Sequence, residues 1–127
     1  MVYKFAELTH EIIGIAMAIH REIGPGFQEK IYHHAMVYAL KEAKYNFKSE
    51  QEFEVIFRGY TIGLFRVDLC IENTIIVELK AVQGALQPLF QTQTISYLKA
   101  SGIEVGLLIN FGNKSLDVKR LARYKFI

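Results

Sequence analysis

Three charged residues stand inside apolar segments near the middle of the sequence and could do chemistry. They are Asp68, Glu78 and Lys80, within VDLCIENTIIVELK. Charged side chains normally avoid apolar strands unless they are paired or bind a metal ion. Two neighbouring carboxylates repel each other unless a cation lies between them, and oxygen ligands of this kind suit Mg²⁺ or Mn²⁺. The segment therefore predicts a metal site, with Lys80 beside it to orient or activate a water for phosphodiester hydrolysis.

The two carboxylates share a face only in one register of the predicted hairpin. Because side chains alternate along a strand, Glu78 and Val77 project to opposite faces. A two-residue loop at Glu72-Asn73 would place Asp68 opposite Val77, whereas a three-residue loop or a bulge pairs Asp68 with Glu78. We predict the second register. A backbone carbonyl, that of Leu79, and waters would complete an octahedral coordination shell.

A purely structural pairing of the same charges is the alternative. Glu78 could pair with Lys80, or Asp68 with Arg66, on a solvent-facing side of the sheet. An aspartate followed by ExK also occurs by chance. Residues elsewhere in the chain must therefore decide between the two interpretations.

Other polar residues could support such a site. Gln93 and Tyr97 lie four positions apart on a predicted helix, so they share one face and offer an amide and a phenol. The alternative for this pair is a partly exposed helix face. His20 precedes a glycine-rich corner that we expect to fold it back toward Glu29, although a histidine is more often a surface or partly buried residue than a ligand.

The glycine-rich corner GPGFQEKIY lies between two predicted helices. It follows a helix instead of a strand and lacks the GxGxxG or GK[ST] spacing, which excludes a phosphate-binding loop. Gly24-Pro25 ends the first helix, and the second begins near Gly26-Phe27. Glu29 would then lie in the first helical turn, where the positive end of the helix favours a carboxylate.

The apolar periodicity predicts the elements that carry these groups. A three- to four-residue period predicts helices over 6–23, from the corner to about 44, and over 87–100. The second helix would bury the stripe Phe27, Ile31, Ala35, Tyr38 and Ala39. Alternation and β-branched residues predict strands over 51–58, 62–71, 74–81 and 104–111, with turns at Gly59-Tyr60 and Glu72-Asn73, and residues 117–125 could add one more element. The order helix, helix, three strands, helix, strand predicts an α/β fold of mixed α+β type, a mixed sheet flanked by helices, in a single domain over 1–127.

Composition sets wide limits. The formal net charge of +2 gives no strong attraction to nucleic acid or membrane, and the basic residues concentrate at Lys114, Lys119, Arg120, Arg123 and Lys125. Cys70 is the only cysteine, which excludes an intrachain disulfide and favours a reducing, cytoplasmic compartment. The sequence contains neither a signal peptide pattern nor an apolar run long enough to span a bilayer.

Together these motifs resemble the PD-(D/E)xK nuclease superfamily, and specifically the small prokaryotic proteins of the GxxExxY family. The resemblance extends from about Leu8 to Arg120. The matching positions, in chain order, are Gly26, Glu29 and Tyr32 for GxxExxY, Asp68 for the acidic strand, Glu78, Leu79 and Lys80 for ExK, and Gln93 with Tyr97 for a QxxxY element like that of the RecB-like branch. Val67 stands where the superfamily commonly has a proline before the aspartate.

The resemblance implies a restriction-endonuclease-like core and a role for each matched residue. Glu29, Asp68 and Glu78 would be metal ligands, directly or through water, and Lys80 would be the catalytic lysine. Gln93 and Tyr97 would support the site, and Tyr32 would help to orient the carboxylate of Glu29.

The expected function is therefore a Mg²⁺- or Mn²⁺-dependent nuclease acting on DNA or RNA. A homodimer would provide the second site needed to cut both strands of a duplex. Two rivals stay open: a catalytically silent module that binds nucleic acid or protein with the same fold, and a purely structural domain.

Overall fold

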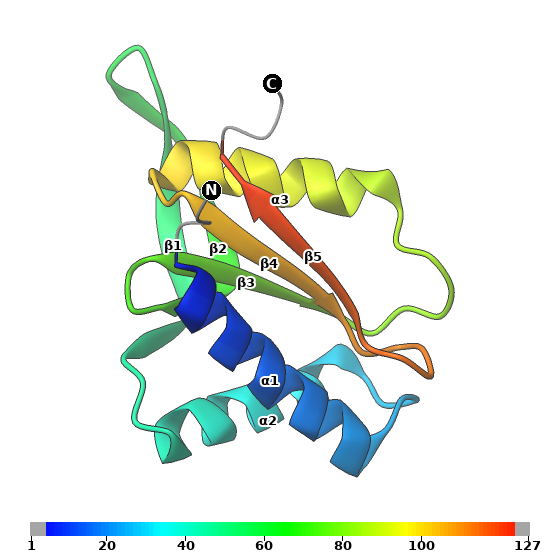
Figure 1. Cartoon of the computed structure of the whole chain (residues 1–127). Helices are drawn as coiled ribbons and strands as arrows, with labels where there is room; N and C mark the ends of the chain where they lie inside the picture. The colour runs from blue at the N-terminus through cyan, green and yellow to red at the C-terminus, as the bar shows by residue number, and fades with distance from the viewer. Residues whose placement is uncertain (1–4, 124–127) are drawn as a thin grey trace.

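The computed structural model describes residues 5–123, and these residues form eight elements (Figure 1). In chain order they are α1 (Ala6–Ile23), α2 (Glu29–Glu42), β1 (Phe47–Phe57), β2 (Tyr60–Ile71), β3 (Ile75–Lys80), α3 (Pro88–Ser101), β4 (Val105–Asn110) and β5 (Asp117–Ala122). The mixed arrangement of helices and strands predicted from the sequence is confirmed. The element proposed for 117–125 is the strand β5, and Lys125 lies outside the described residues.

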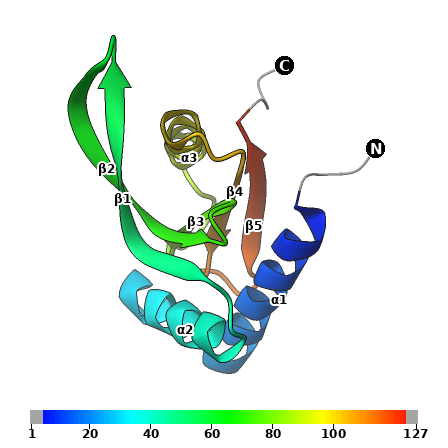
Figure 2. The same ribbon diagram turned by 90° about the vertical axis from the view of Figure 1, so that its left-hand side faces the viewer.

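The five strands form one mixed sheet in the order β1-β2-β3-β4-β5. All neighbouring pairs are antiparallel except β3 and β4, which are parallel and connected through α3. Helices α1 and α2 cover one face of the sheet, and α3 covers the other (Figures 1 and 2). Within residues 5–123, no helix is long and apolar enough to cross a membrane.

Two apolar clusters, one on each face, hold these layers together. The larger one packs α1 and α2 on the sheet, with Ile12, Met36, Leu79 and Leu107 completely buried. The smaller one packs α3 on the opposite face around Ile76, Leu98 and Leu108. Because β3 and β4 contribute to both clusters, their residues are buried on both faces, as is usual for parallel strands.

Several predicted boundaries differ from the structure. Strand β1 begins at Phe47, and its turn is Arg58-Gly59, one residue earlier than the predicted Gly59-Tyr60. Arg58 and Gly59 have φ values of 51° and 85°, which identify the tight primed turn that suits the twist of a hairpin. Helix α2 begins at Glu29, because Gly26 has a φ of 110° that excludes it from a helix.

The buried stripe predicted for α2 is only partly confirmed, because Ala35 and Ala39 are partly buried and pack against the larger cluster but the other members are exposed. Tyr32, Met36 and Leu40 are completely buried, whereas Phe27 is 52% exposed and Tyr38 is 68% exposed. The prediction counted the helical period from Phe27, which lies before the helix begins. The true stripe starts at Tyr32, whose ring stacks on Phe111 with centroids 4.6 Å apart.

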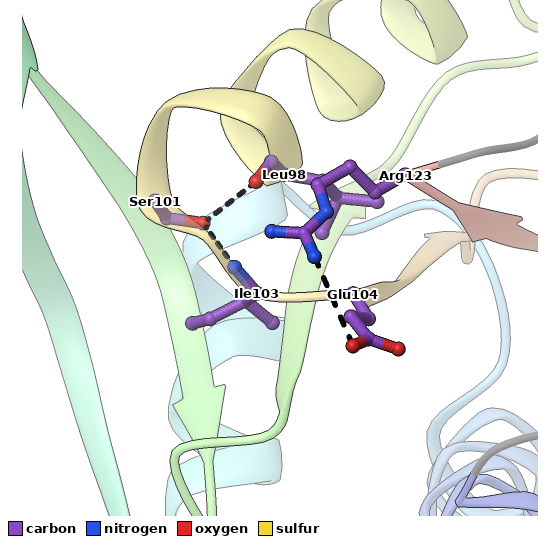
Figure 3. Close-up of polar contacts among 5 residues, drawn as sticks. All are labelled: Leu98, Ser101, Ile103, Glu104 and Arg123. Atoms are coloured by element: carbon purple, nitrogen blue, oxygen red, sulfur yellow. Dashed lines mark hydrogen bonds and ion pairs between the residues drawn. The ribbon is translucent and has the colours of Figure 1, made fainter.

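The end of α3 is held by a small set of polar contacts (Figure 3). Gly102 has a φ of 78° and ends the helix in the left-handed conformation. The hydroxyl of Ser101 donates to the carbonyl of Leu98 and accepts the N–H of Ile103. Arg123, just after β5, lies 3.8 Å from a carboxylate oxygen of Glu104, just before β4. These contacts fix α3, which carries the predicted residues Gln93 and Tyr97, to the edge of the sheet.

Candidate functional site

The predicted register of the β2–β3 hairpin is confirmed. Leu69 lies opposite Val77 and Ile71 opposite Ile75, so the loop has three residues and Asp68 continues the same register toward Glu78. The ladder between the two strands stops at Leu69. Beyond Leu69, β2 stays paired with β1 and diverges from β3, which continues beside β4 (Figure 2). We call the place where β2 and β3 separate the notch.

Two carboxylates occupy the notch and replace the missing backbone ladder. Glu78 Oε2 accepts the N–H of Asp68 at 2.8 Å, and Asp68 Oδ2 accepts the N–H of Leu79 at 2.7 Å. Each carboxylate thereby satisfies a buried backbone donor that would otherwise lose its partner. The structural alternative that paired Asp68 with Arg66 is not observed, because Arg66 lies 3.8 Å from Glu52 on β1.

The electrostatics of the notch are dominated by crowded negative charge. Glu78 is only 6% exposed, and burial together with the charge of Asp68 raises its pKa from 4.5 to about 8. The hydrogen bond from the Asp68 backbone and the charge of Lys80 act in the opposite direction and only partly compensate. A carboxyl with this pKa is mostly protonated at pH 7, in spite of Lys80, unless a further cation such as a metal ion binds beside it.

Glu29 approaches the same charges from the other side of the sheet. It is the first residue of α2 and so lies in the first helical turn, as predicted. Its pKa is raised by burial and by Asp68, although Lys80 and His33 act in the opposite direction. A cavity of about 340 Å³ lies at this end of the helix. Its lining residues are Glu29, Lys30, His33, His34, Val37, Ser49, Glu50 and Asp68.

The corner that positions Glu29 depends on two glycines and a tyrosine. Gly24 and Gly26 have φ values of 78° and 110°, which residues other than glycine rarely adopt. The hydroxyl of Tyr32 donates to the carbonyl of Gly24 at 2.7 Å and accepts the N–H of Phe27 at 3.2 Å. Tyr32 therefore bonds to the corner backbone, not to the carboxylate of Glu29 as expected, and it positions Glu29 through the shape of the corner.

His20 lies elsewhere than the sequence analysis expected. Its Nε2 is 2.7 Å from the carbonyl oxygen of Asn113, in the loop after β4, and its ring packs 6.2 Å from that of Phe111. These contacts attach the last turn of α1 to the loop after β4, which lies beside the corner. The histidines that line the cavity are His33 and His34, and the Nε2 of His33 lies 2.7 Å from the hydroxyl oxygen of Ser49.

Lys80 follows Glu78 on the same face of β3 and has an aromatic neighbour that the sequence did not reveal. Its ammonium lies 4.4 Å from the ring centre of Phe90, in the first turn of α3. Such a contact restrains the ammonium without neutralising it. No local sequence pattern links Phe90 to Lys80.

The two predicted residues on α3 differ in their surroundings. Tyr97 is half-buried and stacks on Phe65 of β2 with ring centroids 4.5 Å apart. Burial raises the pKa of its hydroxyl, and Glu78 and Asp68 raise it further, which places the phenol near the notch. Gln93, one turn earlier, is exposed.

Two asparagines that the sequence analysis missed hold the segment between Lys80 and α3. Asn110, completely buried, accepts the N–H groups of Val82 and Gly112 and donates to the carbonyl of Val82. Asn113 makes the equivalent pair of bonds with Gly84. The signal was available, because Asn110 is the polar exception at the end of the apolar strand VGLLIN.

The donor atoms in the notch suit a hard divalent cation. Asp68 and Glu78 each use one oxygen for a backbone N–H, and the other oxygen of each remains for a ligand. The carbonyl of Leu79 faces the same strand edge as its N–H, since both groups of a residue point to one side of a strand. In the part of the chain that the structure describes, no three His, Cys, Asp or Glu side chains cluster as direct ligands of one ion.

Comparisons with known proteins give a family match and two similar folds. The family model described as the PD-(D/E)XK nuclease superfamily matches residues 6–121. The fold is similar to that in the crystal structure of SSO0001, with a TM-score of 0.56, 22% identity, and coverage of 74% of this chain and 50% of that one. The chain thus spans half the length of SSO0001.

A second similar structure is that of the alkaline exonuclease LHK-Exo from Laribacter hongkongensis. The TM-score is 0.54 at 10% identity, covering 96% of this chain and 72% of the exonuclease. No protein of curated function matches the sequence. The family match extends over nearly all of the chain and includes every residue of the notch, and on this evidence the chain belongs to the PD-(D/E)XK nuclease superfamily.

Proposed function

We propose that this chain is a metal-dependent nuclease that hydrolyses phosphodiester bonds of DNA or RNA at the notch. The observation that carries the proposal is the pairing of Asp68 and Glu78 where β2 and β3 diverge, with a backbone donor bonded to each carboxylate. Membership of the nuclease superfamily and the similarity to an alkaline exonuclease support a nucleic acid substrate.

Asp68, Glu78 and the carbonyl of Leu79 would hold Mg²⁺ or Mn²⁺. Glu29 would reach the ion through water, since the three carboxylates do not form a cluster of direct ligands. The bound ion would polarise a phosphoryl oxygen and lower the pKa of a water at the site. Its positive charge would also keep Glu78 ionised at neutral pH, against the burial that raises its pKa.

The other residues would act on the nucleophile and on the developing charge. The ammonium of Lys80 lies near Glu78 and Glu29 and can donate hydrogen bonds to an attacking water and to a phosphate oxygen. The carboxylate of Glu29 can accept a proton from that water. Tyr97 is placed to support the carboxylates from α3, and Gln93 one turn earlier would add an amide at the edge of the site.

Finer assignments belong to the same proposal. The spacing of Gly26, Glu29 and Tyr32 supports membership of the small prokaryotic GxxExxY proteins. A single domain over 1–127 and a cytoplasmic location are further parts of the proposal. One site makes one cut. We therefore propose a homodimer, whose two sites could cut both strands of a duplex.

Cleavage of labelled single- and double-stranded DNA and RNA, with Mg²⁺, Mn²⁺ or EDTA, tests the function. We expect cleavage only with metal, and a loss of at least about 100-fold in Glu78→Gln and Lys80→Met, because each removes charge from the reacting centre. Glu52→Gln, on the outer surface of β1, is the matched control.

The rival interpretations predict different results. A catalytically silent module would bind nucleic acid without cutting it, and its binding would not change in Glu78→Gln or Lys80→Met. Absence of cleavage by the wild-type protein, together with absence of Mn²⁺ binding by calorimetry, would contradict the proposed function.

A further inference from the structure

The β1–β2 hairpin extends well beyond the rest of the sheet. Residues 52–66, which we call the arm, project past the end of the shorter strands and run beside α3 (Figure 2). The arm carries several large apolar side chains in contact with solvent. Their exposed fractions are 55% for Ile56, 53% for Phe57, 75% for Tyr60, 63% for Ile62 and 60% for Leu64. So much exposed apolar surface on one element indicates a binding function.

The strand register divides the arm into two chemically different faces. The inner face, toward α3, carries Phe53, Val55, Phe57, Tyr60, Gly63 and Phe65. The outer face carries Glu52, Glu54, Ile56, Thr61, Leu64 and Arg66. The ion pair between Arg66 and Glu52 and the hydrogen bond from Thr61 to Glu54 confirm the assignment of the outer face.

Aromatic side chains occur near the notch and at the tip of the arm, along the inner face. Tyr97 stacks on Phe65 at 4.5 Å with an interplanar angle of 15°, and Phe65 stacks on Phe53 at 5.5 Å and 20°. Farther out, Phe57 and Tyr60 lie opposite each other beside the turn. The rings therefore form two groups along the inner face, a stack near the carboxylates of the notch and an exposed pair at the tip, separated by the Val55–Gly63 pair. We call the two groups together the column.

Gly63 leaves room within this column. It lies on the inner face between Phe65 and the tip, and a Cβ atom added to it would meet no heavy atom within 4 Å. A flat ring can therefore approach the strand backbone here, with an aromatic side chain on either side. A side chain at this position would fill that space without disturbing the protein.

The charges of the arm favour a polyanion on the inner face only. Glu52 and Glu54 point outward, and the inner face of the arm carries no carboxylate. Arg58 at the tip lies over the ring of Phe57, 4.8 Å from its centre. A nucleic acid is therefore repelled by the carboxylates of the outer face and meets a positive charge at the tip of the inner face.

We propose that the inner face of the arm binds unpaired bases of a single-stranded nucleic acid by stacking and directs that strand into the notch. This inference rests on the proposed function for the nature of the ligand. Aromatic side chains stack with any base, so the column would bind without sequence preference. Bases within a duplex already stack on one another and present no free ring face, so the arm would select single strands or ends.

Fluorescence anisotropy with labelled oligothymidylate in EDTA tests this inference separately from catalysis. The variants are Gly63→Val, which fills the open space with a good strand former, and the double change Phe57→Ala with Tyr60→Ala. We expect each to weaken binding at least about fivefold, since each lost stacking contact weakens binding by roughly that factor or more. Leu64→Thr, an equally exposed change on the outer face, should bind as the wild type does.

The outcomes separate this inference from the proposed function. Unchanged binding in Gly63→Val and in the double variant, or an equal loss in Leu64→Thr, would overturn it. So would a wild-type preference for duplex, or a dimer in sedimentation that the inner-face changes dissociate, because a second copy would then cover the arm. Selective loss of single-strand binding in a protein that cuts nothing would keep the inference and overturn the nuclease proposal.

Discussion

Glu78 is a nearly buried carboxyl with two other carboxyls close enough to raise its pKa, Asp68 across the strand pair and Glu29 at the start of α2. Among residues 5–123, Lys80 is the cation whose charge lowers the pKa of Glu78, and the ring of Phe90 restrains its ammonium. The balance of charge at single residues therefore leaves the notch short of positive charge. Both a proton and a metal ion would relieve this shortage, and they compete for the same place.

The metal-free protein should lose stability as the pH rises from about 4.5 to about 8. The pKa of Glu78 is raised to about 8 in the folded state, so the folded protein binds more protons than the unfolded chain in this range. The stabilising contribution is complete below about 4.5 and is lost as the pH passes through 8. Urea unfolding in EDTA at a series of pH values measures this, and Glu78→Gln should flatten the dependence. An equal slope in the variant would contradict the assignment.

Replacing Phe90 by leucine should slow cleavage while the protein stays folded. The substitution removes the ring beneath the Lys80 ammonium, a contact typically worth about 0.5–1 kcal/mol at such a site. We expect single-turnover rates to fall about two- to fivefold. Leu89→Ala, at a 65% exposed neighbour, is the control and should have no effect. A loss of similar size in the control would point to a general disturbance of α3.

At the scale of whole elements, two short connecting segments position the catalytic side chains. The corner before α2 sets the position of Glu29. Asn110 at the end of β4 and Asn113 in the loop after it fix the segment that follows Lys80. His20 links the two segments, because it lies in the last turn of α1 before the corner and hydrogen-bonds to the backbone carbonyl of Asn113. Both ends of the site thus depend on backbone geometry that side chains enforce from outside the notch.

Gly24→Ala should destabilise the protein, whereas Gly14→Ala should stabilise it. Gly24 has a φ of 78° and a ψ of 175°, a backbone region open almost only to glycine, so an alanine there costs roughly 1–3 kcal/mol although its Cβ would touch nothing. Gly14 lies inside α1 with equally free space, where alanine gains about 0.5–1 kcal/mol over glycine. Chemical denaturation of the two variants compares them directly, and shifts of the same sign would contradict the backbone argument.

Asn110→Ala should cost more stability than Asn113→Ala. The first change leaves the N–H groups of Val82 and Gly112 and the carbonyl of Val82 without their partner in a buried site. Each such loss costs about 1–3 kcal/mol. The bonds of Asn113 to Gly84 are exposed, so water can replace them. Urea unfolding should rank the variants in this order, and a larger loss in Asn113→Ala would contradict it.

At the scale of the molecule, the sheet divides into two parts that share only a short ladder between β2 and β3. One part is β3, β4 and β5 with helices on both faces, and the other is the long β1–β2 hairpin. Asp68 and Glu78 lie where the two parts separate. A metal ion bound there would connect the hairpin to the core of the fold.

Mn²⁺ should therefore raise the stability of the whole chain. Binding to the folded state alone adds about 2.7 kcal/mol at a metal concentration 100 times the dissociation constant. Thermal unfolding with increasing Mn²⁺ should show a rising midpoint in the wild type and none in Asp68→Asn. Glu52→Gln, an exposed carboxylate away from the notch, should respond as the wild type does. A midpoint that rises equally in Asp68→Asn would place the ion elsewhere.

The sequence by itself determined the features that depend on neighbouring residues. Helical and strand periods located the elements, loop length set the Asp68–Glu78 register, and the glycine corner put Glu29 in the first turn of α2. Steric limits on φ and the alternation of side chains act over a few residues. Features that depend on them can therefore be predicted from a local sequence pattern.

Only the tertiary structure decided which distant groups meet. It separated β2 from β3, turned His20 toward Asn113 and placed Phe90 beneath Lys80. It also chose the Tyr32 face of α2 for burial in place of the Phe27 face. These choices follow from packing on both faces of the sheet, where the free energy depends on contacts between residues tens of positions apart that no local pattern encodes.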